Sequence, residues 1–243
     1  MSGPLLPEKI LCLVTDRSIF EAGRHPPEAR LVDAASKAVS GGVNMVQLRE
    51  KGLPGRDLLA LAREVRKVTR KGAVFIVNDR VDVAIASGAD GVQLSEQSMP
   101  ISAARRVAGS ELLIGRSVHD LCGAEDAEYE GADFLVVGTI FQSRSHPGLA
   151  AAGTKLIREI RERVSIPIVG IGGITAANAE RVFDAGAKGV AVIGAILDAV
   201  DHRMAAKKLS DALGLADSPS ESLPSPQNPS DQNRTAQNQE TNQ

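Results

Sequence analysis

The sequence predicts an α/β fold, a single (β/α)₈ TIM barrel followed by a disordered C-terminal tail. Three observations predict it: a glycine-led motif repeated four times, eight short apolar runs, and a last stretch that is almost devoid of apolar residues. A chain of 243 residues is long enough for one large domain. We therefore expect a barrel domain over residues 1–216 and a polar tail over residues 217–243.

The repeated motif consists of a glycine, a small residue and a polar residue, followed by an apolar run. It occurs as GVNMVQL, GADGVQL, GADFLVV and GAKGVAV, beginning at Gly42, Gly88, Gly131 and Gly186. Glycine supplies the left-handed backbone that commonly ends a helix, so each motif indicates a helix end followed by a buried strand. The glycines lie 46, 43 and 55 residues apart, which fits two strand–helix units per repeat.

Four further apolar runs lie between the repeats, beginning at Ile10, Val74, Leu112 and Pro167. Continuous apolar strands without polar alternation are typical of a parallel sheet buried on both faces. Each run precedes a helix-like stretch, such as DLLALAREVRKVTRK. Eight such units within about 205 residues fit a closed barrel. A doubly wound open sheet is the alternative, and the near-even fourfold spacing argues against it.

Composition limits the partners and the location. The net charge is −2 without a basic block, which predicts neither a nucleic-acid partner nor an anionic membrane surface. No apolar segment approaches the roughly 18–20 residues of a membrane span, and no secretory signal is visible, so we expect a cytoplasmic protein. The sequence is compatible with a homo-oligomer. The tail is rich in Ser, Pro, Gln and Asn, a composition that cannot offset the entropy of ordering.

In such a barrel the active site forms at the carboxyl ends of the strands. The second predicted strand presents Gln47, Arg49 and Lys51, which alternation points to the same side. Arg49 and Lys51 could hold a large anion, with Arg offering a bidentate fork. The alternative is a solvated loop pair with Glu50.

Oxygen ligands at the end of the third predicted strand suggest a metal. The third strand ends in Asn78 and Asp79, and oxygens of this kind suit Mg²⁺. The alternative is that Asp79 caps the next helix. Glu96 follows the fourth strand, and Ser117 adds a hydroxyl at the end of the fifth.

The sixth strand leads into VVGTIFQSRSHPG, which delivers Ser143, Arg144, Ser145 and His146 together into a loop. A lone loop histidine is more often incidental than catalytic. The seventh strand ends in GIGGI at Gly170–Ile174, with a helix expected near Thr175, and the eighth ends similarly near Gly194. Glycine-rich loops and helix starts at these two strands often bind phosphate. The alternative there is tight strand–helix packing.

The motifs resemble, in order, the thiamine phosphate synthase/TenI family. They are LCLVTD, VQLREK, FIVND, GADGVQL, IGRSVH, VVGTIF, IPIVGIGGI and GAKGVAVIGAI, spanning about residues 10–197. The resemblance implies condensation of hydroxymethylpyrimidine pyrophosphate with thiazole phosphate to give thiamine phosphate and pyrophosphate. In this chemistry pyrophosphate leaves first, aided by Mg²⁺, and the thiazole nitrogen captures a stabilised pyrimidine carbocation.

The resemblance also implies roles for individual residues. Asp79 matches one Mg²⁺ ligand. Ser143 and Ser145 match hydroxyls that contact the thiazole substrate. The pyrophosphate and pyrimidine binders would be Gln47, Arg49, Lys51, Asn78 and Ser117. The thiazole-phosphate site would be Gly173, Ile193 and Gly194. The catalytic candidates are Arg49, Lys51, Ser117 and His146.

The chain also departs from the synthase pattern. Ser98 stands where a second Mg²⁺ aspartate is usual, with Glu96 as a substitute two residues earlier, and His146 stands where a lysine is usual. The alternatives are a TenI-type thiazole tautomerase or a non-catalytic binder of thiazole or thiamine phosphate. The tautomerase places a histidine at the position of Thr139. We favour the synthase because the chain keeps Gln47, Arg49 and Lys51 on the second strand and Asn78 and Asp79 on the third. These residues suit the binding of pyrophosphate, which a tautomerase does not need.

Overall fold

The computed structural model describes residues 5–70, 72–143 and 151–215. The predicted tail, Ser145 and His146 lie outside the described residues, so the division into barrel and tail stays a prediction.

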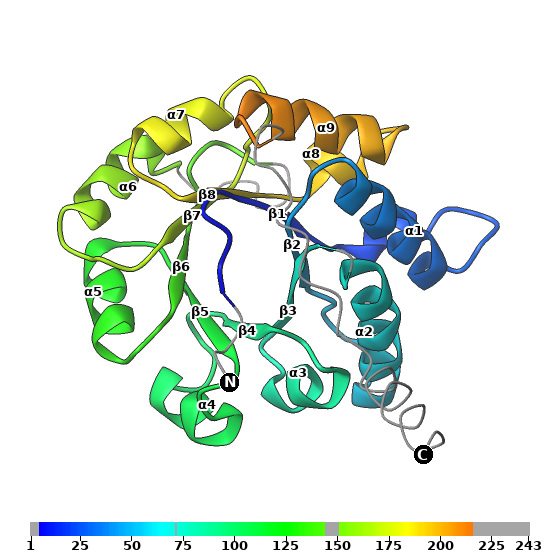
Figure 1. The fold of residues 1–243 in the computed structure, drawn as a ribbon, viewed down its shortest axis with the longest axis horizontal. Coiled ribbons are helices and arrows are strands. Elements are labelled where there is room, and N and C mark those ends of the chain that lie inside the picture. Colours follow the sequence, from blue (N-terminus) through cyan, green and yellow to red (C-terminus); the bar gives the residue numbers. More distant parts are fainter. Residues whose placement is uncertain (1–4, 71, 144–150, 216–243) are drawn as a thin grey trace, which may run out of the picture.

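Eight parallel strands close into a barrel in sequence order, with β1 paired to both β2 and β8 (Figure 1). This confirms the predicted fold class and each of the eight predicted strand runs. The strands are β1 (Ile10–Val14), β2 (Met45–Leu48), β3 (Val74–Asn78), β4 (Gly91–Leu94), β5 (Leu113–Val118), β6 (Phe134–Val137), β7 (Ile168–Ile171) and β8 (Gly189–Val192).

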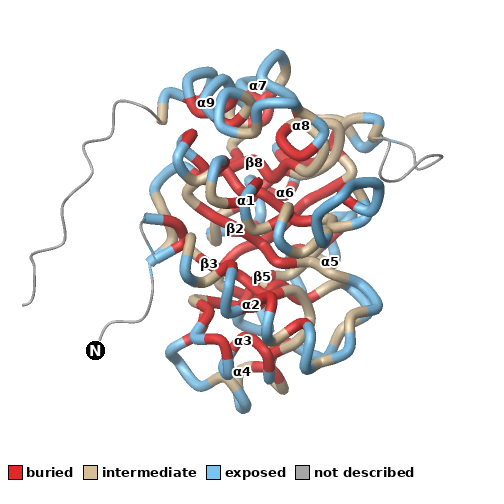
Figure 2. Tube along the Cα trace, turned by 90° about the vertical axis from the view of Figure 1, so that its right-hand side faces the viewer, coloured by how far each residue is buried: buried red, intermediate tan, exposed pale blue. Residues whose placement is uncertain are grey.

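Helices form a ring outside the barrel and bury one face against it (Figure 2). In α2 the buried residues Leu58, Leu61, Ala62 and Val65 recur at the spacing of a single helix face. The helices are η1 (Arg17–Phe20), α1 (Pro27–Ser40), α2 (Gly55–Thr69), α3 (Val81–Ser87), α4 (Ile101–Ala108), α5 (Leu121–Tyr129), α6 (Gly153–Arg161), α7 (Ala179–Asp184), α8 (Gly194–Leu197) and α9 (His202–Ala212).

The repeated motif has two structural roles. Its four glycines all have positive φ, between 67° and 106°, as expected of helix ends. Its polar residue faces the amino end of a neighbouring strand in three of the four copies. The side-chain oxygens of Asn44, Asp90 and Asp133 accept hydrogen bonds from the backbone N–H groups of Leu11, Phe75 and Ile114, at 2.9, 2.7 and 2.7 Å.

Two of these contacts are reinforced by arginines from the helix ring. Arg66 of α2 makes a bidentate pair with Asp90, at 2.7 and 2.8 Å, and Arg105 of α4 contacts Asp133 at 2.6 Å. We call the three side chains Asn44, Asp90 and Asp133 the amino-end clasps. Each joins two neighbouring strands, because its side-chain oxygen accepts a hydrogen bond from the backbone N–H of the adjacent strand. They lie at the end of the barrel opposite the predicted site.

The barrel interior changes character along its axis. Toward the amino ends of the strands, the lower part of the interior is apolar and includes Ile10, Met45, Ile76 and Phe134. Leu6, from the segment before β1, packs against these residues. Cys12 lies in this core, and burial raises the pKa of its thiol to about 12. Toward the carboxyl ends of the strands, the interior is polar on β2–β5 and apolar on β1, β6, β7 and β8. The predicted site at this end therefore has a polar half and an apolar half.

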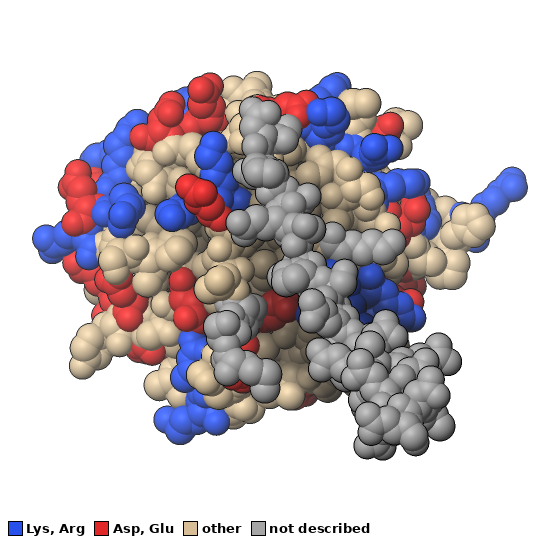
Figure 3. Space-filling view, viewed as in Figure 1, with Lys and Arg blue, Asp and Glu red and all other residues tan. Residues whose placement is uncertain are grey.

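Within the described residues, no helix is long and apolar enough to cross a membrane. On the face shown in Figure 3, acidic and basic side chains are interspersed around the described part of the rim. This distribution agrees with the near-neutral charge of the chain.

Candidate active site at the carboxyl ends of the strands

A cavity of about 770 Å³ opens at the carboxyl ends of the strands. It brings together predicted residues that are far apart in the sequence. Those that line it are Gln47, Arg49, Lys51, Asn78, Asp79, Glu96, Ser117, Ser143, Gly173, Ile193 and Gly194. Two predicted residues, Ser145 and His146, lie outside the described part of the chain. Thr139, at the position where a tautomerase would need histidine, also lines the cavity.

A chain of hydrogen bonds orders the β2–β4 side of the cavity. The Gln47 amide donates to Asn78 Oδ1 at 2.8 Å, and the Asn78 amide donates to Asp79 Oδ2 at 2.8 Å. Asp79 Oδ1 accepts from the Ser95 backbone N–H at 2.8 Å. The alternative role of Asp79 as a helix cap is therefore wrong: α3 is preceded by Arg80 and has no side-chain cap. Asp79 instead adopts a φ of 57°, which turns its carboxylate toward the next strand end.

Ser117 is oriented by a buried amide. Gln93 of β4 is 1% exposed and donates from Nε2 to Ser117 Oγ at 3.0 Å. Because this bond uses an acceptor site of the hydroxyl, the hydroxyl hydrogen is available for a ligand oxygen. Gln93 Oε1 is buried without a hydrogen-bond partner among the described residues.

The cavity offers carboxylate oxygens of the kind that Mg²⁺ prefers. Asp79 and Glu96 both line the cavity, and Mg²⁺ is commonly held by one or two carboxylates plus substrate phosphates. The described residues contain no group of three His, Cys, Asp or Glu that could hold a metal by itself. Ser98 is absent from the lining, and its backbone N–H donates to Ser95 O within the turn after β4.

His119 is a cavity residue that the sequence analysis did not select. Its Nδ1 hydrogen-bonds to Gly138 O at the end of β6, and its Nε2 lies 3.8 Å from Glu96 Oε2. It lines the cavity two residues beyond Ser117. The sequence places it with Ser117 at the end of the fifth strand, because residues two apart on a strand point to the same side.

The glycine-rich loop after β7 packs against the loop after β6. Phe141 N donates to Gly172 O at 3.0 Å, and a Cβ added to Gly173 would lie 2.3 Å from Gln142 O. Gly173 also has a φ of 61°, and it both lines the cavity and packs against the loop after β6. Close strand–helix packing, the alternative for this glycine-rich segment, occurs instead at Gly170, where an added Cβ would lie 2.7 Å from Val182 of α7.

The expected helix start near Thr175 is wrong. Helix α7 begins at Ala179, because Asn178 Oδ1 accepts from Thr175 N at 2.8 Å and the intervening residues form a turn. Any anion site after β7 is thus made of loop backbone, without a helix axis aimed at it. Helix α8 begins at Gly194 but is only four residues long.

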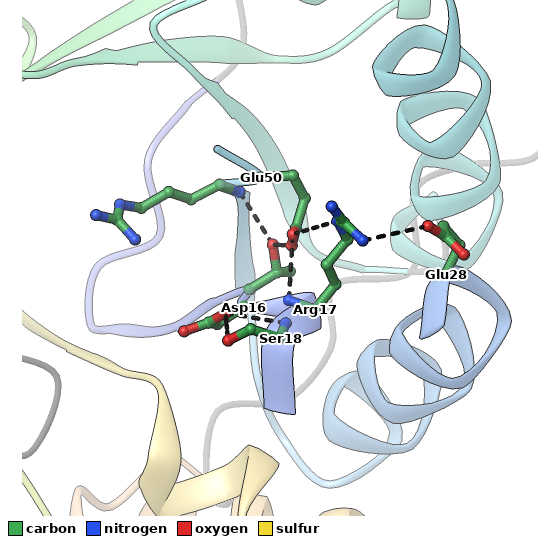
Figure 4. A network of polar contacts seen from close by, with 7 residues as sticks. Asp16, Arg17, Ser18, Glu28 and Glu50 are labelled. Carbon is green, nitrogen blue, oxygen red and sulfur yellow. Dashed lines mark hydrogen bonds and ion pairs between the residues drawn. The ribbon is translucent and has the colours of Figure 1, made fainter. Parts of the chain in front are cut away.

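The buried position of Glu50 overturns the alternative in which it forms a solvated loop pair with Arg49 and Lys51. Its side chain is only 3% exposed and points away from solvent (Figure 4). Thr15 Oγ1 donates to Glu50 Oε1 at 2.6 Å, and Arg17 N donates to Oε2 at 3.1 Å. Burial raises the pKa of the Glu50 carboxyl, while the hydrogen bond from Thr15 lowers it. Local sequence gave no sign of this arrangement.

Known proteins share this organisation. The family described as thiamine monophosphate synthase matches residues 11–196. The thiamine-phosphate synthase of Methanoculleus marisnigri is 45% identical over 208 residues, covering 85% of this chain and 96% of that protein. The thiamine-phosphate synthase of Moorella thermoacetica is 45% identical over 178 residues, covering 72% of this chain and 85% of that protein.

A solved structure extends the likeness to three dimensions. The thiamine phosphate pyrophosphorylase of Pyrococcus furiosus superposes with a TM-score of 0.76 at 36% identity, covering 87% of this chain and 98% of that one. The family match spans strands β1–β8 and includes every residue that lines the cavity at their carboxyl ends except Asp198. The chain therefore belongs to the thiamine monophosphate synthase family.

Proposed function

We propose that the chain is a transferase of thiamine biosynthesis, located in the cytoplasm. It joins hydroxymethylpyrimidine pyrophosphate to thiazole phosphate and forms thiamine phosphate and pyrophosphate. The observation that carries the proposal is one cavity with two unlike walls, with cations and amides after β2, β3 and β5, and glycine-rich backbone after β7 and β8. Two phosphorylated substrates of unequal charge need two anion sites of unequal strength.

The wall at β2, β3 and β5 suits the pyrophosphate substrate. Arg49 offers a bidentate fork and Lys51 a point charge, so together they can hold several phosphate oxygens. Ser117 donates its hydroxyl hydrogen, since Gln93 already occupies an acceptor site. Gln47 and Asn78, linked by a hydrogen bond, offer their remaining polar groups to the pyrimidine ring.

Asp79 would hold Mg²⁺, with Glu96 as the second carboxylate on the same cavity. A bound Mg²⁺ would neutralise charge on the pyrophosphate and so help it to leave. The two hydrogen bonds to Asp79, from Asn78 and from the Ser95 backbone, fix the direction of its carboxylate. The chain would in this way present a rigid carboxylate beside the cations.

The opposite wall suits the thiazole phosphate. Backbone N–H groups near Gly173, Ile193 and Gly194 can approach a phosphate closely because little side chain intervenes. Ser143 lines the same cavity and would contact the thiazole substrate. Ser145 and His146 stay predicted contacts.

The reaction needs position and charge stabilisation more than a protein nucleophile. The bond between the pyrimidine methylene carbon and the pyrophosphate oxygen breaks, and the electron pair leaves with pyrophosphate. The thiazole nitrogen then donates its lone pair to that carbon. Val14, Val136 and Ile171 line the apolar half of the cavity, where they would keep water from capturing the pyrimidine carbocation. Holding both substrates in line contributes the rest of the rate.

The test is to incubate the purified chain with both substrates and Mg²⁺ and to follow thiamine phosphate and pyrophosphate. We expect the two products in equal amounts, and none when either substrate is omitted. A parallel reaction with the carboxythiazole tautomer tests the tautomerase alternative. Binding of thiazole phosphate without turnover in either reaction would identify a non-catalytic binder and contradict the proposal.

A further inference from the structure

The loops after β1 and β2 are joined by a hydrogen-bonded chain that ends at the backbone of a cavity residue. Glu50 Oε1 accepts from Thr15 Oγ1 at 2.6 Å, and Thr15 Oγ1 in turn accepts from Arg49 N at 3.0 Å. Thr15 N also donates to Gln47 O at 2.9 Å, which continues the β1–β2 ladder. Thr15 is fully buried, so the protein supplies all partners of this hydroxyl.

The direction of these bonds is forced by chemistry. A hydroxyl has one hydrogen to donate and lone pairs to accept with. Because the Arg49 N–H can only donate, Thr15 must accept from it and must give its own hydrogen to Glu50. By accepting this hydrogen, the Glu50 carboxylate fixes the rotamer of Thr15. That rotamer directs a lone pair of the Thr15 hydroxyl at the Arg49 N–H, which keeps the Arg49 backbone in place.

The second oxygen of Glu50 holds the other loop. Oε2 accepts from Arg17 N at 3.1 Å and lies 3.8 Å from Arg17 Nε, while Arg17 Nη1 lies 3.7 Å from Glu28 of α1 (Figure 4). Asp16, beside Arg17, is bound to Ser18. Glu50 belongs to the loop after β2. Its two carboxylate oxygens bind two residues of the loop after β1, Thr15 and Arg17.

Charge alone does not account for this residue. A carboxylate next to Arg49 and Lys51 in the chain lowers the positive potential that the two cations offer to an anion. Burying it also costs desolvation free energy, which is why its pKa is raised. The contribution that remains is geometric: with Glu50 buried, the residues before and after it face the cavity.

We propose that Glu50 is a positioning residue, acting through the Thr15 hydroxyl to aim Arg49 and Lys51 at the pyrophosphate. This inference rests on the proposed function, because it takes pyrophosphate as the anion that Arg49 and Lys51 hold. It assigns no contact between Glu50 and any substrate.

The test compares Thr15→Val with Thr15→Ser. Valine keeps the shape of threonine but leaves Arg49 N–H unpaired, whereas serine keeps the hydroxyl. Calorimetry with inorganic pyrophosphate and Mg²⁺ should show affinity about tenfold weaker for Thr15→Val, the scale of a lost buried hydrogen bond. Thr15→Ser should stay within about twofold of the parent. Binding of thiazole phosphate should change less than about twofold in both variants, because its wall lies across the cavity.

Two further variants separate position from folding. Glu50→Gln keeps an oxygen for Thr15 but turns an N–H₂ group toward the Arg17 N–H, so we expect pyrophosphate affinity about fivefold weaker. Glu28→Gln removes the carboxylate that pairs with Arg17 Nη1 from α1, and it should leave pyrophosphate affinity unchanged. Circular dichroism melts of all four variants show whether the barrel is folded at the assay temperature.

The outcomes distinguish the inference from the function it rests on. A parent protein that binds no pyrophosphate would contradict the proposed function. A parent that binds it, together with folded Thr15→Val and Glu50→Gln variants of undiminished affinity, would overturn the positioning role alone. Equal losses for pyrophosphate and thiazole phosphate would also overturn it, since they would indicate a general loosening of the barrel.

Discussion

The two ends of the barrel use polar side chains in opposite ways. At the amino end, Asn44, Asp90 and Asp133 accept hydrogen bonds from strand backbones. At the carboxyl end, Asn78 donates a hydrogen bond to Asp79, and Asp79 also accepts one from the Ser95 backbone, yet both side chains face a cavity of about 770 Å³. Residues of the same chemical types therefore serve the joining of strands at one end and the binding of ligands at the other.

The comparison predicts that variants at the carboxyl end lose activity without losing stability. Arg49→Ala should give the largest effect, a fall in kcat/KM of roughly 10²- to 10³-fold, because a cation facing the pyrophosphate is removed. Steady-state kinetics with each substrate varied in turn is the measurement. Arg56→Ala is the matched control, since this arginine side chain is 93% exposed. Similar losses in both variants would mean that Arg49 acts only through overall charge.

Variants of the amino-end clasps should lose stability without losing activity. Asn44→Ala leaves the buried Leu11 N–H and the Lys9 carbonyl without their side-chain partner, which should cost about 1–3 kcal/mol. The melting temperature should fall by roughly 2–4 °C per kcal/mol for a domain of this size, with kcat unchanged where the variant is folded. Ser40→Ala is the control, because the exposed Ser40 hydroxyl donates to Ser36 O within the same helix, α1. A stable but inactive Asn44→Ala would break the division between the two ends.

The fold was predictable because each repeat carries local signals for its own helix end and strand. The positive φ of Gly42, Gly88, Gly131 and Gly186 agrees with that reasoning. The alignment of Gln47, Arg49 and Lys51 on one cavity followed from alternation alone. The clasp role of the polar residue in the same repeat was missed, because it depends on a strand that lies more than ten residues away.

The site was predicted less completely where its geometry depends on distant partners. Glu50 meets Thr15 and Arg17 from a neighbouring strand end, and nothing in REK indicates that the middle residue is buried. The start of α7 was placed four residues early, because Asn178 closes a turn that resembles helix in sequence. His146 lies outside the described residues, and its catalytic role stays a prediction.

A smaller effect is expected in the dependence of stability on pH. Burial raises the pKa of Glu50 in the folded chain, so the folded state holds this proton more tightly than the unfolded state does. Its contribution to the free energy of unfolding is therefore greatest below the ordinary glutamate pKa of about 4.3 and falls as pH rises through the raised pKa. Glu50→Gln lacks this dependence.

Urea unfolding of the parent and of Glu50→Gln, from pH 4 upward in steps of about half a unit, measures the difference. The parent's free energy of unfolding relative to the variant should decrease with rising pH across that window. A relative stability that increases with pH would show that the folded pKa is lowered instead.

The smallest effect is expected for the tail. Deleting residues 217–243 should leave the melting temperature within about 1–2 °C and thiazole phosphate binding unchanged, because the composition offers almost nothing to bury. Differential scanning calorimetry and titration of the shortened chain are sufficient. A loss of several degrees would indicate that the tail docks on the barrel.

One pair of substitutions tests the division of the barrel most directly. Asp79→Asn and Asp90→Asn make the same chemical change at opposite ends, and both are compared with the parent by Mg²⁺-dependent formation of thiamine phosphate and by thermal melting. We predict that Asp79→Asn loses at least about 100-fold in rate, or needs far more Mg²⁺, at an unchanged melting temperature. Asp90→Asn should keep its rate but melt several degrees lower, since the bidentate pair with Arg66 is lost. An Asp79→Asn variant with full activity after chelation of Mg²⁺ would contradict the account.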